Sequence, residues 1–175
     1  MRRTGKTTIL RMIYDNLENK NKVFLDMENP LHQKIFEETN YDNILSNFEV
    51  FGINKEEKAY VFIDEIQIKG EIVKIAKYLL DHHETKFFLT GSSSYYLKNL
   101  FPESLSGRKI MFELYPLDFE EFLVFKETKK TFFDKFNEKD QNKNYIHYEK
   151  IKKLYDEYLH FGGFPQVVLE KDKEK

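Results

Sequence analysis

Apolar positions in the first half of the chain follow two different patterns. Residues 6–19 and 70–83 place apolar side chains three and four positions apart, as in amphipathic helices, with Ile9, Ile13 and Leu17 on one side of the first. Three shorter runs, KVFLDM, AYVFI and KFFL, are almost wholly apolar, which is typical of strands covered on both faces of a parallel sheet. This alternation predicts an α/β fold with a mostly parallel sheet flanked by helices.

The second half of the chain has a less regular pattern. SYYLKNLF at 94–101 predicts a short helix, and RKIMFEL at 108–114 is a fourth strand candidate. PLDFEEFLVF predicts a helix with Asp118 at its N-cap, and a later helix is expected to stop at Gly162-Gly163. We therefore expect a core at 1–125, a polar connection at 126–144 and a helical segment at 145–175.

Composition and charge narrow the class of protein. The 175 residues fit one domain of ordinary size. Since 28 Lys and Arg residues are balanced by 30 Asp and Glu, a nucleic-acid role would need a local basic patch. The chain has no cysteine, which excludes disulfides and thiolate metal sites, and no apolar run approaches the roughly 18 residues of a membrane span. We expect a cytoplasmic protein with no membrane segment.

The tripeptide Gly5-Lys6-Thr7 is the second half of the phosphate-binding signature G-x-x-x-x-G-K-[ST], and a predicted helix follows it. In such a loop the glycine amide approaches the phosphate, the lysine reaches the β and γ phosphates, and the hydroxyl binds Mg²⁺. The alternative is an ordinary polar helix start. The stretch expected to bind nucleotide comprises Arg3, Thr4, Gly5, Lys6, Thr7 and Thr8, with Thr7 also a ligand of Mg²⁺.

Two adjacent carboxylates, Asp64 and Glu65, follow the most apolar predicted strand. Open α/β sheets place their ligands at the carboxyl ends of strands. There Asp64 is expected to bind Mg²⁺, and Glu65 is expected to orient the water that attacks a phosphate. The alternative is a solvated acidic strand end, but the presence of Lys6 upstream favours the Mg²⁺ site.

The strand in FFLTGSSS ends in hydroxyl side chains. Two interpretations of these hydroxyls stay open. In the first, Thr90 and Ser92 lie beside the γ-phosphate or position water, and Thr90 binds nucleotide while Ser92 is catalytic. In the second, the serines form a turn and a helix cap.

Arg108, which follows Gly107, is a candidate arginine finger. Such an arginine reaches a phosphate from a neighbouring subunit and stabilises the charge on the phosphoryl group during transfer. A surface arginine at the start of a strand is the alternative.

Five segments carry a family resemblance in this order: RRTGKTT, VFIDEIQ, FFLTGSSS, LSGRKIMFELYPLDFEEFL and GGFPQVV. The set resembles the AAA+ P-loop ATPases of bacteria and archaea in which an ATPase core precedes a C-terminal domain of unknown function. The resemblance implies a core that binds ATP and Mg²⁺, with Lys6 and Thr7 in Walker A, Asp64 and Glu65 in Walker B, and Thr90 or Ser92 as sensor 1. The possible finger is Arg108.

The chain departs from that pattern at both ends. Members of the family have a strand and a glycine before the position of Arg2, whereas here Met1 stands there, and the resemblance also implies a C-terminal domain beyond 175. We therefore expect a fragment whose sheet lacks the strand before Walker A, leaving unpaired backbone groups on the neighbouring strands.

Three functions are compatible with these motifs. The leading hypothesis is an ATPase that hydrolyses Mg-ATP to drive a conformational change. The second is a truncated nucleotide-binding remnant or interaction module without turnover, and the third is an ATP-dependent regulator associated with nucleic acid. Because an arginine finger acts between subunits, a homo-oligomer is a candidate assembly, and a protein or DNA partner would bind through the absent C-terminal domain.

Overall fold

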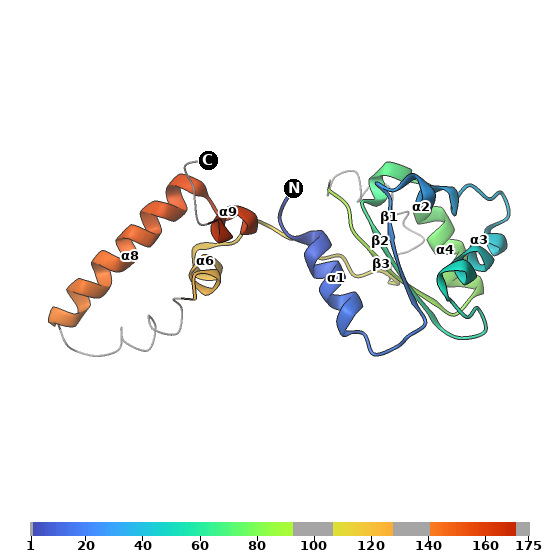
Figure 1. Ribbon diagram of the computed structural model, residues 1–175, viewed down its shortest axis with the longest axis horizontal. Helices are drawn as coiled ribbons and strands as arrows, with labels where there is room; N and C mark the ends of the chain where they lie inside the picture. The colour runs from blue at the N-terminus through green and yellow to red at the C-terminus, as the bar shows by residue number, and fades with distance from the viewer. Residues whose placement is uncertain (1, 93–106, 128–140, 171–175) are drawn as a thin grey trace. The chain divides into compact units, whose positions relative to one another are not determined.

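The computed structural model describes residues 2–92, 107–127 and 141–170, which form two compact units. The N-terminal unit comprises Lys6–Glu113, and the C-terminal unit comprises Arg2–Gly5 together with the chain from Leu114 onward. Figure 1 shows the sheet in the first unit and the long helix α8 in the second. The expected short helix at 94–101 lies outside the described residues.

The N-terminal unit is built on a parallel sheet in the order β1-β2-β3. The strands are β1 (Lys22–Asp26), β2 (Ala59–Asp64) and β3 (Thr85–Leu89), and each is one of the expected apolar runs. β2 is central, with five of its six residues buried, because helices cover both of its faces. The expected α/β fold with a parallel sheet is confirmed.

The larger core lies on one face of this sheet. Val61 and Ile63 of β2 point into it, and they are fully buried. Helices α3 (Tyr41–Phe48) and α4 (Ile72–His82) supply the facing side chains, including Phe48 and Leu79. Three short helices complete this side of the unit: α2 (Pro30–Lys34), η1 (Glu49–Phe51) and η2 (Ile66–Lys69).

Helix α1 (Lys6–Asn16) packs on the opposite face of the sheet, which carries aromatic side chains. Phe24 and Phe62 are paired in register, and Tyr14 of α1 meets both rings edge-on at centroid distances of 5.7 and 5.3 Å. Phe62 also stacks on Phe88 of β3 at 4.4 Å. Because side chains alternate along a strand, Asp64 lies on the same face as Phe62, the face that α1 covers.

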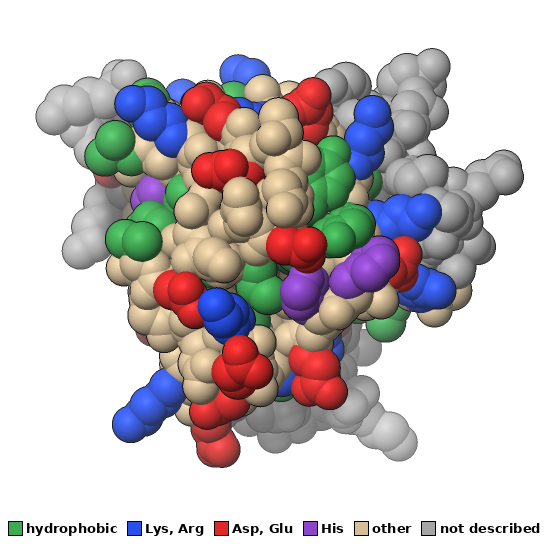
Figure 2. Space-filling view, turned by 90° about the vertical axis from the view of Figure 1, so that its right-hand side faces the viewer, with side chains coloured by type: hydrophobic (Ala, Val, Ile, Leu, Met, Phe, Trp, Pro, Cys, Tyr) green, Lys and Arg blue, Asp and Glu red, His purple; other side chains and the backbone are tan. Residues whose placement is uncertain are grey.

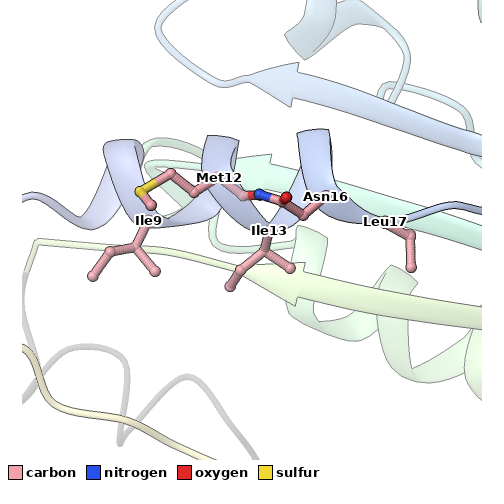
Figure 3. Close-up of a pocket in the computed structure, with 5 residues that line it drawn as sticks. All are labelled: Ile9, Met12, Ile13, Asn16 and Leu17. Atoms are coloured by element: carbon pink, nitrogen blue, oxygen red, sulfur yellow. The ribbon is translucent and has the colours of Figure 1, made fainter.

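The apolar side of α1 is only partly covered. Leu10 is buried, whereas Ile9 and Ile13 are 44% and 41% exposed. Figure 3 shows Ile9 and Ile13 extending from the same side of the helix, where with Met12, Asn16 and Leu17 they line a shallow hollow. Within the described part of the N-terminal unit, these side chains are therefore only partly covered. Helical spacing therefore found the helix correctly, but it did not indicate how much of its apolar side is buried.

The strand expected at 108–114 is wrong. The described residues 107–114 contain no strand, and Ile110 and Phe112 are 83% and 87% exposed. β3 is an edge strand of the described sheet, and no described strand pairs with residues 109–113. An apolar segment without a hydrogen-bonded neighbour has no ladder to join, so its apolar composition alone does not make it a strand.

A buried asparagine fixes the loop that leads into β2. The Asn21 amide nitrogen donates to the backbone carbonyls of Asn54, Glu57 and Lys58 at 2.9, 3.2 and 3.1 Å. Its side-chain oxygen accepts from the backbone N–H of Asn54 at 2.7 Å. Asn21 is 7% exposed, so these bonds form away from water and hold the loop against the start of β1.

The C-terminal unit contains α6 (Phe119–Phe125), α8 (Gln141–Phe161) and α9 (Pro165–Leu169). Asp118 is the N-cap of α6, as expected, and forms a capping box with Glu121. The small core contains Phe122, Leu123 and Val168, with Leu154 and Tyr158 packed against it. α8 ends at Phe161, directly before Gly162, as expected, and Gly162 adopts a left-handed φ of 75°.

Neighbouring Gly163 allows close backbone contact in this unit. Its carbonyl accepts a hydrogen bond from the Leu117 N–H at 2.7 Å. A Cβ at this position would lie 2.0 Å from the Leu117 carbonyl oxygen, so a larger residue would overlap the backbone.

The predicted boundary at 125 differs from the division into compact units. The structure groups α6 with α8 and α9, because Phe122 and Leu123 share a core with Val168. α8 begins at Gln141, inside the predicted polar connection, most of which lies outside the described residues. The division into core, connection and helical segment stays a prediction. Among the described helices, none has the length and apolar character needed to cross a membrane.

Candidate functional site

The carboxyl ends of β2 and β3 bring four of the predicted site residues together. Asp64 ends β2 and is 4% exposed. Thr90 follows β3, and its hydroxyl donates a hydrogen bond to the Asp64 carboxylate. Backbone hydrogen bonds fix this arrangement. The Thr90 N–H donates to the Ile63 carbonyl at 3.0 Å, and the Thr90 carbonyl accepts from the Ile66 N–H at 3.0 Å. Asp64 is therefore a buried carboxylate held at one position by a neighbouring strand end.

Glu65 leaves the strand in a left-handed backbone conformation, with φ 56° and ψ 47°. This conformation is unfavourable for a residue with a side chain, and such residues gather at functional sites. The Glu65 N–H donates to the Thr90 hydroxyl at 3.3 Å, and its carboxylate accepts from the Ser92 hydroxyl at 2.8 and 2.9 Å. Thr90 and Ser92 thus contact the two predicted Walker B residues directly.

Gln67 also belongs to this cluster, although the sequence pattern predicted no role for it. Its side-chain amide donates to Glu65, and its amide oxygen accepts from the Ser92 backbone N–H at 3.2 Å. The signal available in the sequence was its place in VFIDEIQ, two residues after Glu65. Periodicity does not reveal it, because Gln67 lies in the irregular turn of η2.

The predicted Walker A residues lie on either side of the start of α1. Lys6, Thr7 and Thr8 form its first turn, as expected, and its first backbone N–H groups lack partners within the helix. Gly5 has a φ of 92°, a conformation that glycine adopts without strain. This local geometry suits an anion at the helix start.

The residues before Gly5 belong to the C-terminal unit. Thr4 is 3% exposed, and Arg3 has a left-handed φ of 61°. The backbone at Arg3 is therefore not extended just before the helix starts. Their expected role in nucleotide binding stays a prediction.

Arg108 forms an ion pair with Asp81 of α4 in the same unit. Its side chain is 59% exposed, so the guanidinium remains accessible. The role of Arg108 as an arginine finger stays a prediction. To contact a phosphate on a neighbouring subunit, Arg108 would have to break its ion pair with Asp81.

A second polar cluster joins α3 to α4, away from the predicted site residues in sequence. The Asp42 carboxylate accepts from Tyr78 Oη at 3.1 and 3.2 Å, and His83 Nε2 lies 2.9 Å from Asp42 Oδ1. The hydrogen bond from His83 lowers the pKa of Asp42, and the bond from Tyr78 acts in the same direction against partial burial. Burial, followed by the bond to Asp42, raises the pKa of Tyr78.

The described residues contain no group of three or more His, Asp or Glu side chains arranged to hold a metal ion. Mg²⁺ bound with a nucleotide needs fewer protein ligands, because phosphate oxygens and water complete its coordination. One buried carboxylate, Asp64, with a hydroxyl on the first turn of α1, has the oxygen chemistry that this ion prefers. The residues present therefore fit a Mg-nucleotide complex.

Charge on the N-terminal unit is mixed. Figure 2 shows one face of this unit, on which acidic and basic side chains are interspersed and histidines lie among them. The visible described surface carries no broad basic patch of the kind that holds a nucleic-acid backbone.

One family model and three relatives match this chain. A family model described as an AAA domain matches residues 1–123. An uncharacterized protein of Haemophilus influenzae is 30% identical over 174 residues, and two uncharacterized proteins of Methanocaldococcus jannaschii are 31% and 29% identical over 179 and 187 residues. These matches cover 97 to 99% of this chain. No solved structure matches it.

The chain spans less than half the length of each of these relatives. It covers 39% of the Haemophilus protein and 36% and 38% of the two Methanocaldococcus proteins. The names of all three relatives state no activity, so they indicate no substrate or partner. Since the AAA-domain model matches well over half of the sequence and includes β1, β2, β3 and the residues at their carboxyl ends, the chain belongs to the AAA-type ATPase family.

Proposed function

We propose that this chain binds ATP with Mg²⁺ and hydrolyses it, and that hydrolysis drives a conformational change. The observation that carries the proposal is the pair Asp64 and Glu65 at the end of the central strand, held by the hydroxyls of Thr90 and Ser92. At the carboxyl end of the sheet, side chains that follow β3 fix the two carboxylates that follow β2. Such an arrangement suits phosphoryl transfer, in which positioning and charge stabilisation account for most of the rate acceleration.

Each residue has a distinct role in this proposal. Phosphate binding is assigned to Gly5 and Lys6, and further nucleotide contacts are assigned to Arg3, Thr4 and Thr8. Thr7 and Asp64 hold Mg²⁺, which neutralises charge on the phosphate oxygens when it is bound. Glu65 accepts a hydrogen bond from the attacking water and orients it. Thr90 binds nucleotide and Ser92 is catalytic, and their hydroxyls donate to Asp64 and Glu65 respectively.

The experiment compares nucleotide binding with turnover in the 175-residue chain. Binding is measured with a fluorescent ATP analogue in Mg²⁺, and turnover is measured as phosphate release. Lys6→Ala is expected to weaken binding at least about tenfold, because it removes a charge-assisted contact with phosphate. Glu65→Gln is expected to bind nucleotide normally and to release phosphate about a hundredfold more slowly.

Lys20→Ala, which removes an exposed lysine after α1, is the matched control and should bind and hydrolyse as the parent chain does. Unchanged binding in Lys6→Ala would contradict the proposal. Normal binding with no turnover in the parent chain would leave nucleotide binding in place and would favour the interaction module without turnover.

Arg108 gives a separate test of assembly. An arginine finger serves the site of a neighbouring copy, so Arg108→Ala should lower turnover per site only at concentrations where the chain self-associates. Sedimentation at the same concentrations identifies that range. Equal turnover of Arg108→Ala and the parent chain throughout the range would remove Arg108 from the catalytic set.

A further inference from the structure

We propose that Gln67 is a positioning residue that holds the Glu65 carboxylate for the attack of water on the nucleotide, a role that rests on the proposed ATPase function. Gln67 donates one hydrogen bond and accepts another. Its amide nitrogen donates to Glu65, and its amide oxygen accepts from the Ser92 N–H at 3.2 Å. One side chain therefore links the residue after β2 to the segment after β3.

The two contacts fix how the amide is oriented. A carboxylate only accepts hydrogen bonds, and a backbone N–H only donates them. The Gln67 nitrogen must therefore face Glu65, and its oxygen must face Ser92. A glutamate at this position would have no donor for the Glu65 carboxylate, and an apolar residue would contribute neither contact.

Glu65 needs such support because of its backbone. Its φ of 56° is a left-handed backbone conformation that non-glycine residues rarely adopt. Strained conformations of this kind persist when surrounding contacts fix them. Gln67 and Ser92 provide those contacts on the side chain, and Thr90 provides one on the backbone at 3.3 Å.

The arrangement leaves part of the carboxylate available. Gln67 and Ser92 supply two hydrogen-bond donors to a group that accepts about four. Glu65 Oε2 receives the Gln67 bond, whereas both carboxylate oxygens lie within 2.9 Å of the Ser92 hydroxyl. Oε1 therefore has more remaining capacity for water than Oε2.

A double-mutant cycle tests this role in the 175-residue chain. Gln67→Ala, Glu65→Gln and the double variant are compared with the parent chain for binding of the fluorescent ATP analogue and for single-turnover hydrolysis. Gln67→Ala should bind within about twofold of the parent chain and hydrolyse about tenfold more slowly, the value of one hydrogen bond to a charged group. In the Glu65→Gln background, the same substitution should cause no further loss.

Gln33→Ala is the matched control. The Gln33 amide donates to the Met27 carbonyl at 2.8 Å, so the substitution removes a similar amide contact without touching Glu65. It should leave both binding and hydrolysis within about twofold of the parent values. Equal losses from Gln67→Ala in both backgrounds, or a loss of binding that matches the loss of turnover, would overturn the proposed role.

A second measurement does not depend on turnover. In ¹⁵N-labelled protein without nucleotide, the side-chain amide signal of Gln67 is identified by its absence from Gln67→Ala. Glu65→Ala should move this signal and speed its exchange with water about tenfold, because the carboxylate acceptor is lost. Asp15→Ala, which removes an exposed carboxylate of α1, should leave it unchanged.

The two measurements separate the two proposals. If Lys6→Ala binds nucleotide normally, the ATPase proposal fails, and the Gln67 signal still reports whether the amide holds Glu65. If nucleotide binding behaves as proposed but the Gln67 signal ignores Glu65→Ala, the positioning role is wrong and the ATPase proposal stands.

Discussion

The Thr90 hydroxyl donates a hydrogen bond to the Asp64 carboxylate, joining the ends of two adjacent parallel strands. Asp64 is 4% exposed, so it has little access to water that would replace this partner. A buried charge whose partner is removed is costly, because its desolvation is no longer compensated. The contact therefore serves both the stability of the sheet and the position of the predicted Mg²⁺ ligand.

Thr90→Val should lower the free energy of unfolding by about 1 to 2 kcal/mol, since it replaces the hydroxyl by a methyl group of similar size. Urea denaturation measures the change. Thr85→Val is the control, because the Thr85 hydroxyl is buried and has no hydrogen-bond partner within the described residues. It should be neutral or stabilising, and a larger loss from Thr85→Val than from Thr90→Val would contradict this interpretation.

Lys22→Met should loosen the end of α1. The Lys22 ammonium donates to the carbonyls of Tyr14 and Leu17 at 2.5 and 2.7 Å, and a positive charge at the carboxyl end of a helix is stabilising. Methionine keeps an apolar stem of similar length but removes the charge. We expect a loss of about 1 to 2 kcal/mol in the free energy of unfolding, measured in urea.

Lys20→Met removes an exposed charge two residues earlier and should change stability by less than about 0.5 kcal/mol. Raising the salt concentration should reduce the difference between Lys22→Met and the parent chain only in part, because Lys22 is partly buried. Equal effects of the two substitutions would show that the contacts with the carbonyls contribute nothing measurable.

The Asp42 cluster predicts a pH dependence of stability. Folding lowers the pKa of Asp42 below 3.8, so its contribution is present above that value and is lost as pH falls through the lower folded pKa. Folding raises the pKa of Tyr78 above 10.0, so the neutral phenol contributes below that pH and its contribution is lost as pH rises further.

Asp42→Asn should therefore be less stable than the parent chain at neutral pH, and the difference should shrink below about pH 4 and above about pH 10. The urea midpoint of both proteins, measured across this range, tests the prediction. The exposed Asp15→Asn variant should follow the parent chain throughout. A difference between Asp42→Asn and the parent chain that stays constant at all pH values would rule out linkage through this cluster.

Two adjacent glycines give a sharp comparison in the C-terminal unit. Gly162→Ala meets open space but keeps a φ of 75°, which should cost about 1 kcal/mol. Gly163→Ala should cost more, because its Cβ would overlap the Leu117 backbone. Hydrogen exchange of the α6 amides measures both changes. Similar protection of α6 in the two variants would contradict the close contact between Gly163 and Leu117.

The sequence predicted the elements whose local pattern also determines their structure. β2 was found because a strand buried on both faces must be apolar throughout, and the α6 start was found because Asp118 supplies a local cap. The 108–114 strand was wrong because pairing depends on a neighbour, which composition does not report. Asp64 and Glu65 were predicted as site residues at the end of one strand, and Thr90 and Ser92 at the end of another. The structure shows that the two pairs are in contact, and their roles stay predictions.

The contacts that the sequence did not reveal connect residues far apart in the chain. Gln67 was missed because its two partners lie on different strand ends. The pairing of His83 with Asp42 joins positions 41 residues apart, and no local pattern links them. Such contacts depend on tertiary structure, so they follow from the fold and do not appear in periodicity or capping signals.

The buried Asn21 also affects how the protein ages chemically. Deamidation of asparagine starts when the following backbone nitrogen attacks the side-chain carbonyl carbon. The Asn21 amide is held by bonds to three carbonyls, so in the folded chain it is not free to reach that geometry. Its conversion to aspartate would replace a donor by an acceptor facing those carbonyls, and would release the loop before β2. Chemical damage at Asn21 should therefore accumulate through molecules that unfold, and storage lifetime should depend on folding stability.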